Sequence, residues 1–110
     1  MQTAGPEPGA AARRKLLRSV AWKGVAAVAI EALAAARAAE CEDWMRAELV
    51  ALFEDADADA LERMVTGSER HAARRAHEMA DVTDLLRELG VEPRVSDAAR
   101  GWLEQLRDAR

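Results

Sequence analysis

The apolar residues of this chain recur three and four positions apart, and no window shows the alternation that a β-strand requires. This pattern predicts an all-α protein with helices over about residues 10–54, 57–89 and 96–108. Residues 1–9 contain two prolines, two glycines and no apolar periodicity. We therefore expect a disordered tail ahead of a single helical domain that spans residues 10–110.

Turn and capping residues set the expected order of these helices. Asp59, with Glu62 three positions later, forms a capping box at the start of the second helix, and Gly90 followed by Pro93 ends it. Ser96 caps the short third helix, which we expect to act as a lid or a dimer contact. The sequence thus predicts a long antiparallel two-helix hairpin plus a short C-terminal helix. Two such hairpins are expected to dimerise and so to complete a four-helix bundle.

The composition favours self-association. Hydrophobic residues make up 50% of the chain, but 26 of the 110 residues are alanine, which removes little apolar area from water when it is buried. Each helix therefore buries little area within one chain. We expect a homo-oligomer or a helical protein partner to supply the missing burial.

The charges are distributed unevenly, although the net charge is only −4. Residues 1–30 carry five basic groups against Glu7 alone, whereas residues 31–62 carry ten acidic groups against Arg37 and Arg46. An antiparallel dimer along the first helix would set these opposite charges face to face, and a solvated gradient without a partner is the alternative. The negative net charge argues against general nucleic-acid binding, which needs a basic surface.

Cysteine usage and the N-terminal segment bear on localisation. Cys41 is the only cysteine, so no intramolecular disulfide is expected and a cytoplasmic location fits. Residues 13–18, followed by an Ala/Val stretch, loosely resemble a twin-arginine export signal, which is the alternative. Lys23 and Glu31 interrupt the apolar region, so we expect no transmembrane segment, because a span needs about 20 apolar residues.

Several polar residues, among them Glu31, fall on helix positions that should face the partner helix. If the two long helices fold back about the short turn, Glu42 meets His71, and Arg75 and Glu78 follow on the same helix face. Carboxylates and imidazole supplied by facing helices hold iron or manganese in helical bundles. Glu42, His71 and Glu78 are therefore candidate metal ligands, and an internal ion pair of Arg75 with either glutamate is the alternative.

Two further segments point to a family. Residues 61–72 read Leu-Glu-Arg-Met-Val-Thr-Gly-Ser-Glu-Arg-His-Ala, and residues 85–93 end in Leu-Gly-Val-Glu-Pro. With the preceding helix they resemble a rubrerythrin or ferritin-like half-bundle. The resemblance implies two hairpins that dimerise into a four-helix bundle, with Glu42 and His71 as ligands of iron. A relative that keeps the scaffold without the metal fits equally well, because Ser68 stands where the family has its glutamate three positions before the histidine.

Two functions remain open at this point, and a third ranks last. The first is a ferritin-like bundle that binds iron through interhelical Glu and His ligands, with enzymatic activity undecided. The second is a non-catalytic helical adaptor or assembly subunit that acts through protein–protein interaction, with residues 13–23 as a basic docking segment. The third is a basic amphipathic helix at the N-terminus that lies on a membrane surface, for which Leu16, Leu17, Val20 and Ala21 supply too small an apolar face. The sequence shows neither a glycine-rich phosphate loop nor a nucleophile in a catalytic context.

Overall fold

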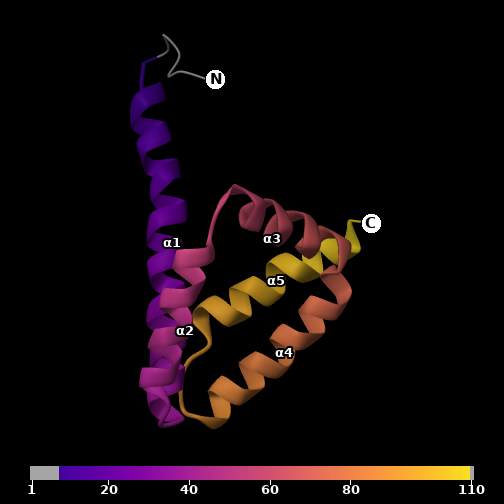
Figure 1. Ribbon diagram of the computed structural model, residues 1–110. Coiled ribbons are helices and arrows are strands. Elements are labelled where there is room, and N and C mark those ends of the chain that lie inside the picture. The colour runs from indigo at the N-terminus through magenta and orange to yellow at the C-terminus, as the bar shows by residue number, and fades with distance from the viewer. Residues whose placement is uncertain (1–7, 110) are drawn as a thin grey trace.

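Five α-helices make up the computed structural model, which describes residues 8–109 (Figure 1). They are α1 (Ala10–Ala38), α2 (Glu42–Asp55), α3 (Ala58–Arg70), α4 (Ala72–Glu88) and α5 (Arg94–Asp108). No strand occurs in this part of the chain, so the prediction of an all-α fold is confirmed. Most of the predicted tail lies outside the described residues, and its last two residues, Pro8 and Gly9, form a turn before α1.

The first predicted helix is divided by a tight turn at residues 39–41. Glu40 adopts a left-handed backbone conformation, with a φ of 61°. The backbone N–H of Cys41 donates to the carbonyl of Ala36 at 2.8 Å, and that of Glu40 donates to the carbonyl of Arg37 at 3.1 Å. This pairing ends a helix and reverses the chain. The helix α2 therefore runs back along α1 and forms an antiparallel hairpin with it (Figure 1).

The second predicted helix is divided as well, at His71, where α3 ends and α4 begins. Gly90, with a φ of 78°, follows α4, as the sequence predicted, and the chain then returns as α5. The helices α4 and α5 form a second antiparallel hairpin, and α3 contacts both of them (Figure 1). The predicted arrangement was one long hairpin with a short third helix. The structure instead has two shorter hairpins, α1–α2 and α4–α5, and α3 connects them in sequence.

The buried core is small and consists mainly of small side chains. Among the described residues, the buried hydrophobic ones are Ala36, Ala72, Ala76 and Leu86. Thr83 is fully buried, and its hydroxyl donates to the carbonyl of Ala80 at 2.8 Å. Alanine contributes little burial energy because its side chain is one methyl group. The stability of the isolated chain therefore depends on a small core.

One carboxylate joins the two hairpins. Glu31 of α1 accepts hydrogen bonds from the backbone N–H groups of Val95 at 2.8 Å and Ser96 at 2.7 Å, and from the Ser96 hydroxyl at 2.8 Å. These N–H groups lie in the first turn of α5, where the helix has no carbonyl of its own to accept them. Partial burial alone would raise the pKa of Glu31, but the hydrogen bonds outweigh it and lower the pKa below its ordinary value.

The helix α1 is much longer than its partner in the hairpin. At about 1.5 Å per residue, the 29 residues of α1 extend about 43 Å, whereas the 14 residues of α2 extend about 21 Å. The helix α2 can therefore cover only about half of α1. The N-terminal half of α1 projects beyond the rest of the protein (Figure 1).

Candidate functional site

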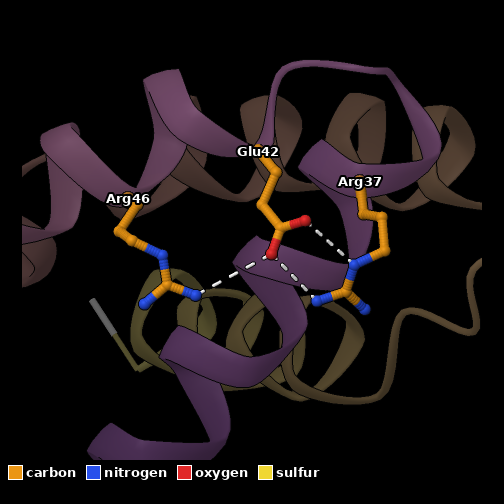
Figure 2. A network of polar contacts seen from close by, with 3 residues as sticks. All are labelled: Arg37, Glu42 and Arg46. Atoms are coloured by element: carbon orange, nitrogen blue, oxygen red, sulfur yellow. Dashed lines mark hydrogen bonds and ion pairs between the residues drawn. The ribbon is translucent and has the colours of Figure 1, made fainter.

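The first predicted metal ligand, Glu42, is held by two arginines at the start of α2 (Figure 2). Arg37 donates from Nε to Oε2 of Glu42 at 3.1 Å and from Nη2 to Oε1 at 3.0 Å, and Arg46 lies 3.8 Å from Oε1. The hydrogen bond from Arg37 is the main reason that the pKa of Glu42 lies below its ordinary value. The carboxylate of Glu42 therefore links the end of α1 to the start of α2 through an exposed ion pair with Arg37.

The other two candidate ligands lie elsewhere. His71 is half-buried at the junction of α3 and α4, and Glu78 is exposed on α4, where Oε1 lies 3.8 Å from Nε of Arg74. Within residues 8–109, no group of three or more His, Cys, Asp or Glu side chains is placed to hold a metal ion. The expected pairing of Glu42 with His71 assumed one continuous helix through residue 54. The turn at Glu40 interrupts this helix, so the assumption does not hold. The iron hypothesis stays a prediction to which this geometry adds no support.

Arg75, expected in an ion pair with Glu42 or Glu78, instead contacts α3. Its Nη1 donates to the hydroxyl of Ser68 at 3.2 Å. Its guanidinium also lies against Gly67, where an added Cβ would be only 2.9 Å from Nη2. The absence of a side chain at Gly67 thus lets Arg75 lie across the bend between the two helices.

The most distinctive surface of the molecule is the apolar surface of α1. Leu16 and Val20 are each 72% exposed and Trp22 is 71% exposed, in the half of the helix that projects from the fold. Further exposed apolar side chains follow along the same helix, and Ala36 is the one buried residue of α1. Successive residues of a helix are 100° apart, so these apolar side chains lie on several sides of α1 and not along one stripe. We call this surface, made by Leu16, Leu17, Val20, Trp22, Val25, Val28 and Ile30, the α1 surface.

The apolar surface continues onto α2. A shallow groove between the two helices is lined by apolar residues, with one charged residue of each sign on α2; the lining residues are Ala29, Leu33, Arg46, Leu49, Val50, Phe53 and Glu54. Val50 and Phe53 are about half exposed. The hairpin therefore presents apolar side chains from both helices along one continuous surface.

Opposite charges accompany the two parts of this surface. The projecting half of α1 carries only basic groups, which are Arg13, Arg14, Lys15, Arg18 and Lys23. The segment from α2 to the start of α3 is mainly acidic, through Asp43, Glu48, Glu54, Asp55, Asp57, Asp59 and Glu62. The uneven charge that the sequence showed is thus arranged along one hairpin.

The helix α1 meets the length and composition requirements of a membrane span. By length and composition it is apolar enough to cross a membrane, the one such helix in the described part of the chain, and 6% of its most apolar window is buried. A signal sequence or the core helix of a soluble protein meets the same criterion, and α1 lies near the N-terminus. One weakly apolar helix of this kind is weak evidence, so residues 8–109 contain no clear transmembrane span.

Comparison with known protein families corrects the expected family membership. Residues 36–106 match a family described as a domain of unknown function (DUF1932). No ferritin-like family matches, so the ferritin-like resemblance was wrong. That resemblance rested on an Ala/Glu/Arg cadence that many unrelated helices share. No curated protein and no solved structure matches the chain.

Proposed function

The chain belongs to the DUF1932 family, whose description assigns no activity, and we propose from its structure that it is a non-catalytic helical assembly subunit. In this proposal, the α1 surface binds the α1 surface of a second copy in an antiparallel arrangement. Two α1–α2 hairpins then complete a four-helix bundle.

The observation that carries the proposal is that the rest of the chain covers α1 only in part. Exposed apolar side chains lie on several sides of α1, and their exposure to water is unfavourable. Of the 29 residues of α1, one is fully buried. Contiguous exposed apolar surface of this kind marks an interaction site.

Charge complementarity favours a second copy in antiparallel orientation. Gly24 lies at the centre of α1, so a two-fold axis near it places the projecting half of one α1 beside the covered half of the other. At equal rise per residue, Arg14 then lies roughly level with Glu48 of the second copy's α2, and Arg18 lies within about one turn of Glu54. Basic groups of each copy thus meet acidic groups of the other at both ends of the bundle.

The exposed apolar area of α1 and α2 supplies part of such an interface. Full burial of an aliphatic side chain is worth about 1.5–3 kcal/mol. At about 25 cal/mol per Å², this energy corresponds to a buried apolar area of roughly 60–120 Å² per side chain. With these areas and the exposed fractions of its seven residues, the α1 surface offers roughly 500 Å² per copy when all sides of the helix are counted. A second copy buries the part of this area that faces it, and the exposed residues of α2 add to the roughly 800 Å² per partner of a standard interface.

A charge-swap experiment tests the proposal. We expect light scattering to give a dimer mass for the unaltered chain and a largely monomeric mass for Arg14→Glu/Arg18→Glu, because like charges then face each other. The variant Glu48→Arg/Glu54→Arg should also be monomeric, and mixing the two variants should restore the dimer. Arg74→Glu/Arg87→Glu on α4, with the same change in charge, is the control and should stay dimeric.

Two outcomes would remove the proposal. One is a monomeric mass at every protein concentration, and the other is a dimer that the Arg14→Glu/Arg18→Glu variant leaves intact. Co-sedimentation of a monomeric chain with phosphatidylglycerol vesicles would assign the α1 surface to a lipid surface instead.

A further inference from the structure

One side of α1 carries a row of apolar residues that runs from the projecting half into the groove between α1 and α2. The members recur four, three and four positions apart, and they are Trp22, Ala26, Ala29 and Leu33. Ala29 and Leu33 line the groove, and Trp22 lies about 10 Å nearer the N-terminus than Ala29. Trp22 is 71% exposed, and Ala26 is exposed as well. This side of α1 therefore places a large exposed ring next to small side chains.

The helix α2 forms one wall of the groove. Its lining residues are Arg46, Leu49, Val50, Phe53 and Glu54. Because α2 runs back along α1 from the turn at residues 39–41, its later residues lie nearer the projecting half of α1 (Figure 1). At equal rise per residue, Phe53 lies roughly level with residue 27 of α1. Phe53 is 54% exposed, and on the facing side of α1 this level has only the methyl groups of alanines.

The register of the proposed dimer brings a tryptophan to this position. With a two-fold axis near Gly24, Trp22 of the second copy lies level with Ala26 of the first and close to the level of Phe53. An indole ring beside a phenyl ring gains from contact between the rings as well as from burial. The large side chain of each copy therefore faces small side chains of the other, which lets the two helices pack closely.

The charges beside this row agree with the same occupant. Arg18 lies one helical turn before Trp22, and Glu54 follows Phe53 at the same end of the groove. In this register, Arg18 of the second copy lies within about one turn of Glu54. Arg46 lines the groove nearer the turn and lies 3.8 Å from Oε1 of Glu42 in its own helix. A basic segment can therefore enter the groove at the end that carries Glu54.

We infer that Trp22 is the anchor residue of the proposed dimer and that the groove between α1 and α2 of one copy receives Trp22 of the other. This inference rests on the proposed function, and it selects one of the several sides of α1 that carry exposed apolar residues. Val20 lies about 160° around the helix from Trp22, so it stays exposed in this dimer. Interface anchors are commonly tryptophans in pockets near the centre of the interface, and Trp22 lies two residues from the expected axis.

Tryptophan fluorescence reports on this site directly. The chain has three tryptophans, so Trp44→Phe/Trp102→Phe leaves Trp22 as the sole emitter. We expect its emission to shift to the blue over the range of protein concentration in which light scattering shows dimer formation, because the indole ring then leaves water. A dimer in which this emission stays that of an exposed indole would overturn the inference.

Substitutions measure the contribution of the anchor. Trp22→Ala should raise the dissociation constant of the dimer by at least about thirtyfold, or about 2 kcal/mol. Trp44→Ala removes another exposed tryptophan of the same hairpin, so it is the matched control and should leave the dissociation constant unchanged. Unchanged circular dichroism spectra of the variants would show that they are folded. Dimerisation of folded Trp22→Ala with the dissociation constant of the unaltered chain would contradict the assignment.

A second substitution tests the contact between the two rings. Phe53→Ala should also weaken the dimer. When it is combined with Trp22→Ala, the two fold-changes should not multiply, because either substitution already removes the same contact. Fold-changes that multiply would show that Trp22 does not pack against Phe53, and the groove would lose its assigned occupant.

The mass of the unaltered chain separates this inference from the proposed function. A monomer at every concentration removes both. A dimer that Val20→Ala dissociates and Trp22→Ala leaves intact keeps the proposed function but moves the interface to another side of α1, so the inference alone fails.

Discussion

Removal of the carboxylate at Glu31 should uncouple the two hairpins and lower the free energy of unfolding. Hydrogen bonds to a charged group contribute about 1.5–3 kcal/mol each, and a helix cap contributes about 0.5–2 kcal/mol. Glu31 makes three such contacts to α5 but is half exposed, which reduces their net value. We expect Glu31→Ala to cost about 2 kcal/mol and Glu31→Gln, which keeps one acceptor oxygen, to cost about 1 kcal/mol.

The same carboxylate gives the protein a defined sensitivity to acid. The pKa of Glu31 is lower in the folded state than its ordinary value of 4.5, so the unfolded chain binds the proton more tightly. The contribution of Glu31 is therefore complete above about pH 4.5 and is lost as the pH falls through the folded pKa. The gap in stability between the unaltered chain and Glu31→Gln should narrow over this range.

Urea denaturation followed by circular dichroism at neutral and acid pH measures both effects. All variants should be compared at one protein concentration, because association adds to apparent stability. Glu88→Ala, an exposed glutamate of α4, is the control and should change stability by less than about 0.5 kcal/mol. If Glu31→Ala unfolds at the same urea concentration as the unaltered chain, or if the gap to Glu31→Gln is the same at both pH values, the reasoning about this contact is refuted.

The two left-handed positions give opposite predictions. Glu40→Gly should stabilise the fold by about 1 kcal/mol, because glycine adopts a φ of 61° without the penalty of a side chain. Gly90→Ala should destabilise it by about 1–2 kcal/mol, since alanine is strained at a φ of 78° although space for its Cβ is open. Thermal melts of the two variants would show the opposite shifts, and a melting temperature that falls with Glu40→Gly or rises with Gly90→Ala would contradict the assignment of strain.

The sequence was informative where a helix end carries a specific residue. Gly90 was expected to end a helix and does so, and the acidic stretch near residues 55–59 was expected to contain a turn. The cap there is Asp57 and not Asp59, since Oδ1 of Asp57 accepts from the N–H of Ala60 at 2.7 Å. The sequence could not show which aspartate of this stretch is the N-cap, because aspartate is a suitable N-cap at each of these positions.

The break at Glu40 left no comparable signal. Helix-favouring residues surround it, neither glycine nor proline is present, and a glutamate occupies the left-handed position that glycine usually fills. Propensity therefore favoured one continuous helix. Tertiary contacts decide otherwise, because the turn lets α2 pack on α1 and lets Arg37 pair with Glu42.

This missed turn also explains why the candidate metal site could not be predicted reliably. Facing residues were assigned by counting from one expected turn, so a reversal of direction ahead of Glu42 changes every pairing. By contrast, Glu31 was recognised as a polar residue on an interior stripe, but its partners at Val95 and Ser96 lie more than sixty residues away. Local patterns contain no information about such a distant helix terminus.

The unequal lengths of α1 and α2 link folding to concentration. An isolated helix of about 15 residues is only marginally stable in water, and the projecting half of α1 has about this length. In dilute solution this half should fray and exchange its amide protons rapidly. In the dimer that we propose, the same residues gain a packed environment, so the helical content per chain should itself rise with protein concentration.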